Sequence, residues 1–259
     1  MKKFAFSIAV LAALACATAA LGYGSLVSSF KAPSALPVGI GYAIGMPSGF
    51  WVSCAGNNYR YRMTTTGSIY ASFPNPAPGS FGCGAANIGG TGYVFIVSNT
   101  ASLVYCIDMD SGSIYSSYRS PGRGTPMGID YCGTGGSYLY CTELEILSKL
   151  YFMEAHTGSI YWSWPLVFLT PADVAYDPRG YLWISDPFGK LVWQCNTKGE
   201  YISTFSVSAY GGVPGGCGCD GTYVYVGICA PVNSVLKFET DPAVGVAPKS
   251  LGKIKALFR

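Results

Sequence analysis

The chain has 259 residues, of which only 11% are charged and 15% are aromatic, and it contains 34 glycines and 20 tyrosines. Its 16 Lys and Arg residues nearly balance its 13 Asp and Glu residues, and no stretch concentrates the basic ones, which excludes the electrostatic footprint of a nucleic-acid-binding protein. Abundant Gly and Tyr with few charges also argue against a disordered chain and favour an all-β protein with many tight turns.

The first 20 residues have the pattern of a secretory signal peptide. Two lysines precede an apolar run over residues 4–14, and an A-x-A cleavage site follows at 17–19. This apolar run is too short to span a membrane, and no later segment is long enough, so we expect no transmembrane segment. We therefore expect an exported protein, secreted or periplasmic. Lipidation at Cys16 is the alternative, disfavoured because Ala13 stands where such a signal usually has Leu.

A seven-residue sequence motif follows the predicted signal peptide and then recurs every 41 to 46 residues. It reads GSLVSSF at 24–30, GSIYASF at 67–73, GSIYSSY at 112–118, GSIYWSW at 158–164 and GEYISTF at 199–205. Apolar residues alternate within the copies, which predicts strands. The last residue is always aromatic, as expected of a side chain packed under the next unit. A period in the forties indicates a solenoid or a propeller.

Three further strands are predicted before each complete copy. Directly before the glycine lie apolar-alternating segments at 59–63, 103–109, 149–155, 190–196 and 234–240. Upstream of these are segments at 49–53, 93–98, 137–142, 180–185 and 222–227. Farthest upstream are strands rich in small residues at 38–42, 81–85, 127–131, 172–176 and 216–220. Small residues suit strands that converge near an axis, and the turn glycines supply the positive φ of a tight hairpin.

Four strands repeated five times predict an all-β fold, a five-bladed β-propeller of four-stranded antiparallel blades. The last unit reaches Asp241-Pro242 without its own copy of the seven-residue motif. We predict that residues 24–30 complete this blade, so that the N-terminal strand closes the ring and removes an exposed edge. A rival is that residues 243–248 supply the outer strand. The predicted organisation is a signal peptide at 1–20, a propeller at 21–248 and a C-terminal tail at 249–259.

Two long stretches carry a family resemblance. Residues 126–164 (PMGIDYCGTGG…GSIYWSW) and 171–205 (PADVAYDPRGYLWISD…GEYISTF) resemble repeats of the NHL/YVTN class found in exported bacterial propellers. The chain is also similar in size, blade number and motifs such as TYVYVG (222–227) to plant-type glutaminyl cyclotransferases, which also occur in bacteria. The Phe-Thr-Gln-Gly-Leu-like inner-strand segment of that family is missing, so no catalytic residue is carried over. Such motifs encode blades, and a shared fold does not fix function.

The loops from second to third strands share one face with the connections between blades, and ligands of such propellers usually bind there. The polar candidates on this face are Asn99, Glu143, Glu145 and Asp186 in the loops and Arg119 and Arg123 in one connection. Opposite charges around one mouth suit a zwitterion or a peptide end. The alternative is a solvated rim whose charges keep the protein soluble.

Asp130 and Asp173 occupy inner-strand positions where the other units have Gly or Ala. A carboxylate near the axis must be solvated, paired or bound to a cation, because burying it alone is costly. The two residues are therefore candidate ligand-binding groups at the channel mouth, or an acid/base pair. The structural alternative is that they tie neighbouring blades together by accepting backbone N–H groups.

Other conspicuous residues favour structural interpretations. His156, the single histidine, lies in a hairpin turn, which excludes a multi-histidine metal site and argues against a Ser-His-Asp triad. The Asp108-x-Asp110 motif lacks the acidic twelfth residue of a calcium loop and predicts a turn. The Tyr–Arg alternation at 59–62 predicts blade packing. Trp162 and Trp164 are interpreted as side chains packed between blades, with a sugar-stacking platform as the alternative.

The ten cysteines include no C-x-x-C motif, and we predict neither a metal site nor a cofactor. Cys54 and Cys229 fall at comparable loop starts in the first and last units, which are neighbours once the ring closes. A disulfide between them would brace the closure of an exported protein.

A complete scaffold without a catalytic constellation favours a monomeric binding module over an enzyme. The sequence leaves its ligand open among a protein, a peptide and a glycan. The first alternative is an enzyme of the five-bladed glutaminyl-cyclotransferase type. The second is a structural component of a cell-surface assembly that docks through the tail at 249–259.

Overall fold

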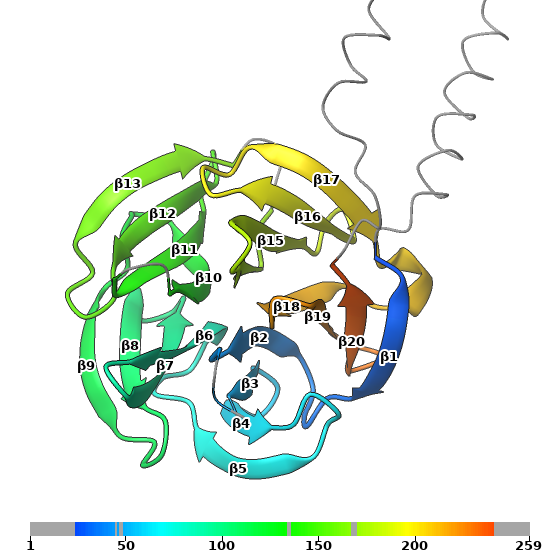
Figure 1. Cartoon of the computed structure of the whole chain (residues 1–259), viewed down its shortest axis with the longest axis horizontal. Coiled ribbons are helices and arrows are strands. Elements are labelled where there is room, and N and C mark those ends of the chain that lie inside the picture. Colours follow the sequence, from blue (N-terminus) through cyan, green and yellow to red (C-terminus); the bar gives the residue numbers. More distant parts are fainter. Residues whose placement is uncertain (1–23, 45, 47–48, 134–135, 167–169, 241–259) are drawn as a thin grey trace, which may run out of the picture.

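A computed structural model describes residues 24–240 except 45, 47–48, 134–135 and 167–169. The described residues form twenty strands in five four-stranded antiparallel sheets around a central axis (Figure 1). The predicted five-bladed propeller is therefore confirmed. The predicted signal peptide, Cys16, the rival strand at 243–248 and the tail lie outside the described residues. None of the described residues belongs to a helix long and apolar enough to cross a membrane.

Each blade runs from an innermost strand at the axis to an outermost strand at the rim. Blade 1 consists of β2 (Pro37–Tyr42), β3 (Phe50–Cys54), β4 (Tyr59–Met63) and β5 (Ile69–Pro74). Blade 2 consists of β6 (Ser80–Ile88), β7 (Thr91–Ser98), β8 (Leu103–Asp108) and β9 (Ile114–Arg119). Blade 3 consists of β10 (Thr125–Cys132), β11 (Tyr138–Leu144), β12 (Lys149–Glu154) and β13 (Ile160–Pro165).

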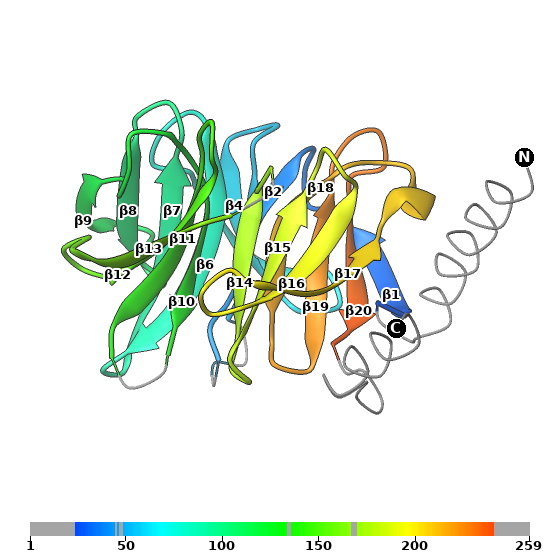
Figure 2. The ribbon, with the colours of Figure 1, turned by 90° about the horizontal axis from the view of Figure 1, so that it is seen from above.

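The remaining two blades complete the ring. Blade 4 consists of β14 (Asp173–Asp177), β15 (Tyr181–Asp186), β16 (Leu191–Asn196) and β17 (Tyr201–Ser206). Blade 5 consists of β18 (Pro214–Cys219), β19 (Tyr223–Ile228), β20 (Ser234–Glu239) and β1 (Leu26–Lys31), and the short 3₁₀ helix η1 (Ser208–Tyr210) precedes it. Figure 2 shows the disc from the side, with inner strands such as β6 and β14 running across its thickness.

The first strand of the chain closes the ring. β1 pairs antiparallel with β20, with Phe30 opposite Val235, and the Glu239 N–H donates to the Ser25 carbonyl oxygen at 3.1 Å. The prediction that the N-terminal segment completes the last blade is therefore confirmed. This pairing covers the edge that β20 would otherwise expose.

The outer strands β1, β5, β9, β13 and β17 form the perimeter (Figure 1). At four junctions the predicted aromatic side chain contacts the repeat glycine of the next blade: Phe30 at Gly67, Phe73 at Gly112, Tyr118 at Gly158 and Phe205 at Gly24. These glycines have φ between 71° and 100°, and at Gly67, Gly112 and Gly158 the hairpin turns require such a positive φ. At the junction of blades 3 and 4, Trp164 also packs into the cluster between the blades, as predicted. The contact with the repeat glycine differs there, because Leu166 takes the place of the aromatic side chain at Gly199.

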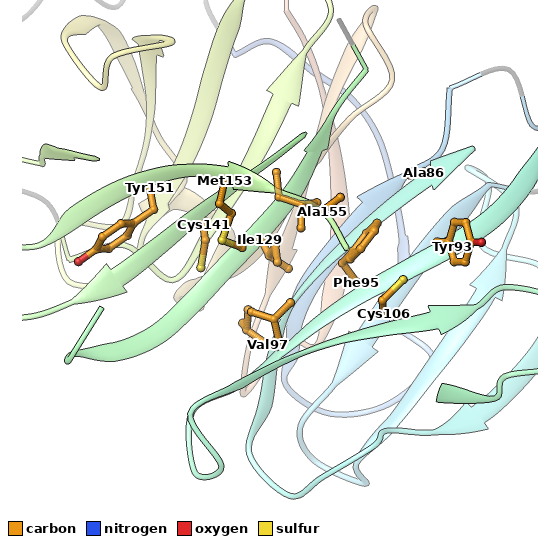
Figure 3. Close-up of a cluster of buried hydrophobic side chains, with 12 residues drawn as sticks. Ala86, Tyr93, Phe95, Val97, Cys106, Ile129, Cys141, Tyr151, Met153 and Ala155 are labelled. Atoms are coloured by element: carbon orange, nitrogen blue, oxygen red, sulfur yellow. The ribbon is translucent and has the colours of Figure 1, made fainter. Parts of the chain in front are cut away.

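The hydrophobic core is divided into five clusters, one at each junction between blades. Figure 3 shows the cluster between blades 2 and 3, where Phe95 and Cys106 of blade 2 lie beside Ile129, Cys141 and Met153 of blade 3. Since every blade shares its apolar faces with both neighbours, burial of these faces depends on a closed ring.

The Tyr–Arg run in β4 serves blade packing, as predicted: its arginines face blade 2, and Tyr61 packs against the cluster between blades 1 and 5. Arg60 is buried and donates to the carbonyl oxygens of Pro74 and Gly112, the latter at 2.9 Å. Burial lowers the pKa of Arg60 to about 10. Arg62 forms an ion pair with Asp110 of blade 2, with 2.8 Å between Nη1 and Oδ1.

Candidate functional site

Two layers of small residues surround the axis. The first layer consists of Gly39, Gly82, Gly128, Asp173 and Gly216. The second lies two residues further along each inner strand and consists of Gly41, Gly84, Asp130, Ala175 and Gly218. A Cβ added to Gly82 would lie 2.5 Å from the Cα of Gly128, so neighbouring inner strands approach backbone to backbone and glycine is required there. Each layer carries one carboxyl group.

Asp173 ties four blades together at the axis. Its Oδ2 accepts from the N–H groups of Ile40 at 3.0 Å and Cys217 at 2.9 Å, and its Oδ1 accepts from Ile129 at 3.4 Å. These donors belong to blades 1, 5 and 3, whereas Asp173 begins the inner strand of blade 4. Its burial raises its pKa by more than the N–H donors lower it. Asp173 thus ties neighbouring blades together by accepting their backbone N–H groups, which was the structural alternative in the sequence analysis.

Only one carboxyl oxygen of Asp130 has a hydrogen-bond partner within the protein. It is 3% exposed, and its Oδ2 accepts from the Tyr176 N–H at 2.7 Å. Its Oδ1 is buried and receives no hydrogen bond of good geometry. Burial raises the pKa of Asp130 well above its usual range, and the N–H groups of Tyr176, Tyr131 and Ala85 lower it less. Burial thus works against the ionised form of this carboxyl group.

A cavity of 310 Å³ lies where the inner strands end, with Asp130 in its wall. Four blades contribute to the lining, which includes Tyr42, Ile44, Ala86, Asn87, Asp130, Tyr131, Tyr176 and Pro178. Ile44, Asn87 and Pro178 are exposed and mark the opening. The layer that contains Asp173 lies two residues earlier along each inner strand. Asp173 in that layer is fully buried and does not line the cavity, which we call the cup.

Three tyrosines make the cup aromatic and uncharged. The Tyr131 hydroxyl donates to the Gly136 carbonyl oxygen at 3.1 Å. The Tyr176 ring stacks on Tyr140, with 6.0 Å between centroids and 15° between planes. Burial raises the pKa of Tyr42 and of Tyr131, so both phenols remain protonated at neutral pH. Such a site can hold a neutral ligand through aromatic faces and hydroxyl groups.

The tyrosines of the cup were missed in the sequence. A signal was present, because three of the five inner strands end in Tyr at the same position: Tyr42, Tyr131 and Tyr176. The other two inner strands have Ala85 and Cys219 there. The three tyrosines of this repeat position come from blades 1, 3 and 4.

Glu143 and Asp186, predicted to form an acidic sector, are used in holding loops. Glu143 is fully buried, and its Oε1 and Oε2 accept from the N–H groups of Gly122 at 2.9 Å and Gly124 at 3.2 Å. Burial raises the pKa of Glu143. Asp186 is 4% exposed and its Oδ1 accepts from the N–H groups of the loop that follows, at 3.0 and 3.1 Å. Backbone N–H groups thus satisfy oxygens of both carboxylates.

The remaining rim candidates do not gather around Asp130. Glu145 pairs with Lys149 at 3.2 Å and accepts from the Tyr151 hydroxyl at 3.3 Å. The side-chain oxygen of Asn99 is buried without a hydrogen-bond partner. The two arginines of the connection, Arg119 and Arg123, are exposed. These residues lie at the ends of second and outer strands, opposite the end of the disc where the cup opens, so the predicted rim and the cup are separate.

The turn motifs have the predicted local roles. Asp108 Oδ1 accepts from the N–H groups of Asp110 at 3.2 Å and Ser111 at 2.7 Å, which is a turn and not a calcium loop. His156 lies in the β12–β13 turn, with its ring centroid 5.6 Å from that of Tyr93. In the described part of the chain, no three His, Cys, Asp or Glu side chains gather as a metal site would require.

The predicted disulfide between Cys54 and Cys229 is not formed in the structure, where both are free, buried thiols. They nonetheless lie at the same junction, because Cys54 pairs with Pro37 across β2 and β3 and the Cys229 thiol lies 3.9 Å from the Pro37 carbonyl oxygen. The Cys54 thiol points to the Ser34 carbonyl oxygen instead, at 3.8 Å. Burial raises the pKa of Cys54 to about 12 and that of Cys229 to about 11.

Comparisons with known proteins support the architecture. No protein-family profile matches the chain, and no curated protein matches it in sequence. Among solved structures, the chain is similar to the glutaminyl cyclase of Myxococcus xanthus, with a TM-score of 0.63 and 13% identity over 84% of this chain and 96% of that chain. This likeness shows the fold alone.

Two further solved structures are more distant. BamB from Moraxella catarrhalis has a TM-score of 0.44 and 11% identity over 83% of this chain and 99% of that chain. A protein of unknown function from Bacteroides caccae has a TM-score of 0.45 and 12% identity over 66% of this chain and 61% of that chain. At these values neither carries a functional argument.

Proposed function

We propose that the protein is an exported binding module that holds an uncharged polar group, such as a peptide amide or a sugar hydroxyl, in the cup at the end of the propeller axis. The observation that carries this proposal is the carboxyl group of Asp130, which is buried in the wall of the cup and has one oxygen without a partner. Export is proposed from the signal-peptide pattern of the first 20 residues.

The protonation state of Asp130 sets the chemistry of the ligand. Because burial favours the neutral form and Oδ2 already accepts from Tyr176, the proton belongs on Oδ1. An O–H group at Oδ1 donates to a carbonyl or hydroxyl oxygen. A buried polar group without a partner costs about 1–3 kcal/mol, and a ligand acceptor removes that cost on binding. A carboxylate ligand does not fit, because the cup offers no cation among its lining residues.

A thermal-shift screen of residues 21–259 against neutral peptides and oligosaccharides tests this proposal. A ligand at a hundred times its Kd adds about 2.7 kcal/mol to the free energy of unfolding, which raises the melting temperature clearly. For any ligand found, Asp130→Ala should weaken binding at least tenfold, whereas Asp130→Asn keeps a donor at this position and should retain most of the affinity. Glu239→Gln removes an exposed carboxylate on β20 and serves as the control.

Two results would contradict the proposal. One is the absence of any shift across the panel, and the other is a ligand whose affinity Asp130→Ala leaves unchanged. Loss of binding in both Asp130 variants would show instead that the ionised carboxylate is the binding group.

An enzymatic role is the second candidate, because a buried carboxyl group with a raised pKa beside a cavity is suited to proton transfer. The Myxococcus xanthus protein with the same fold is a glutaminyl cyclase, so peptides that begin with Gln belong in the panel. Release of ammonia from these peptides, abolished by Asp130→Asn although the peptide still binds, would establish catalysis. Binding without ammonia release supports the binding module.

A further inference from the structure

A second candidate site lies on blade 3, at the rim of the disc and away from the cup. Four aromatic rings form a contiguous cluster there, which we call the blade 3 aromatic patch: Tyr138, Phe152, Tyr161 and Trp162. Phe152 and Trp162 stack with 5.8 Å between centroids and 27° between planes, and Tyr138 lies 4.9 Å from Phe152. Trp162 is 59% exposed and Tyr161 is 48% exposed. The interpretation of Trp162 as an interblade side chain was therefore wrong.

The register of the outer strands shows that the fold does not need a large side chain at the position of Trp162, whereas Tyr138 and Phe152 also pack against the cluster between blades 3 and 4. The position of Phe152 is occupied by Arg62, Cys106, Gln194 and Lys237 in the other blades. The residues paired with these in the outer strands are Ala71, Ser116, Ser203 and Ser28, whereas blade 3 has Trp162. A small residue thus suffices at the outer position in four blades. The large exposed ring of blade 3 requires a reason other than stability.

A β-bulge brings the fourth ring into the patch. The register of β12 and β13 shifts between Phe152 and Met153, so that Tyr161 is the extra residue of the outer strand. Its ring lies 5.9 Å from Trp162, 6.1 Å from Phe152 and 5.5 Å from Tyr138. A bulge re-aims a side chain in this way. The rings support one another, so little side-chain entropy remains to be lost when a ligand covers them.

The four residues of the patch carry no charge, and Tyr138 and Tyr161 bring hydroxyl groups to it. The Glu154 carboxylate is occupied by the N–H groups of His156 and Thr157, at 2.9 and 2.6 Å, and Lys149 is paired with Glu145. Blades 1 and 5 have cations at the Phe152 position instead, with Arg62 above Trp51 and Lys237 above Tyr223. Blade 3 therefore offers open aromatic faces where blades 1 and 5 offer charge.

We propose that the blade 3 aromatic patch binds a neutral polysaccharide by stacking pyranose rings on Trp162 and Tyr161. A pyranose has an apolar C–H face that packs on an aromatic ring and hydroxyl groups at its edge, which the phenols of Tyr138 and Tyr161 can meet. A contiguous aromatic surface without charges complements such a ligand, and large exposed apolar patches mark binding sites. This site is independent of the cup and does not rest on the function proposed for it.

Affinity electrophoresis of residues 21–259 in gels that contain hydroxyethyl cellulose, xylan, laminarin or soluble chitin fragments tests the site. The wild type should be retarded by at least one of these polymers. Trp162→Ser installs the residue that blade 2 has at Ser116, so it should leave the melting temperature unchanged and reduce the affinity at least tenfold. Tyr115→Ser removes an aromatic side chain of blade 2 that is 63% exposed and should keep the wild-type retardation.

Tryptophan fluorescence gives a second measurement. Trp51 and Trp183 are buried, and Trp164 and Trp193 are half-buried, so Trp162 is the tryptophan that iodide should quench most strongly. The retained polysaccharide should protect it from quenching.

Four outcomes would overturn the inference. The first is that no polymer retards the wild type, and the second is that Trp162→Ser is retarded equally. The third is that Trp162→Ser abolishes self-association in sedimentation, or binding to phosphatidylglycerol vesicles, without affecting polysaccharides; the occupant is then a second copy or a lipid surface. Asp130→Ala should leave the retardation intact. If it does not, which is the fourth outcome, the polysaccharide sits in the cup, which supports the proposed function and removes this second site.

Discussion

Three acidic residues identified in the sequence, Glu143, Asp173 and Asp186, accept backbone N–H groups with their carboxyl oxygens. Their side chains hold loops and blades in place, as buried polar groups usually do when they are satisfied. Asp130 differs because one of its oxygens remains without a partner while the group lines a cavity. Sequence alone marks the two axial aspartates as exceptions to the glycine pattern. It cannot separate them, because their hydrogen-bond partners come from other blades.

The raised pKa of Asp130 predicts a specific pH dependence of stability. An unfolded Asp titrates near 3.9, and burial raises the folded value. The native state therefore binds the proton more tightly, and this contribution to stability is complete below about pH 4 and is lost as the pH rises through the folded pKa. Asp130→Asn removes the titration, so its melting temperature should fall less than that of the wild type between pH 5 and pH 8.

Differential scanning fluorimetry across this pH range measures the effect, with Glu239→Gln as the control for losing one exposed carboxylate. Parallel curves for the wild type and Asp130→Asn would show that the Asp130 carboxyl group has an ordinary pKa in the folded protein.

Among the elements, β1 is the first strand of the chain but belongs to the last blade. Its pairing with β20 brings Ser25 within 3.1 Å of the Glu239 N–H, so the two ends of the described chain lie side by side. A circular permutant that moves residues 24–31 behind residue 240 through a short linker should therefore keep the fold and lose no more than about 1 kcal/mol of stability. Deletion of residues 24–31 should expose the edge of β20 and cause aggregation.

Urea unfolding and size-exclusion chromatography compare the two proteins. A permutant that unfolds as readily as the deletion protein would show that β1 does more than close the ring from this position.

The strands were predictable because alternation and turn glycines are local properties repeated five times. The side-chain contacts between blades could not be predicted, because they depend on how neighbouring blades pack against each other. Trp164 is the last residue of its seven-residue motif, as Phe73 is, yet Leu166 takes the place of the aromatic residue at Gly199. The exposure of Trp162 was missed for the same reason, since the sequence of β13 does not tell how much of that strand blade 4 covers.

At the scale of the whole molecule, a nearly five-fold scaffold carries sites that occur once. The cup uses tyrosines from three blades, and the blade 3 aromatic patch departs from the pattern of the other four. The repeated positions maintain the ring, so the departures from the repeat are where function is expected. Asp173 is an exception to this rule, because it breaks the glycine pattern and yet serves the ring itself.

Asp173→Ala should therefore weaken the molecule as a whole. The substitution leaves the N–H groups of Ile40, Ile129 and Cys217, from three different blades, without their acceptor at the axis. Orphaned buried donors cost about 1–3 kcal/mol each, and partial relaxation limits the loss to about 3–5 kcal/mol in urea unfolding. Amide hydrogen exchange should accelerate at these three residues together. Asp173→Asn keeps an acceptor oxygen and should lose less, whereas Asp110→Ala, an exposed carboxylate paired with Arg62, should lose about 1 kcal/mol or less. Faster exchange confined to blade 4 would show that the axial carboxyl group stabilises its own blade and does not couple the ring.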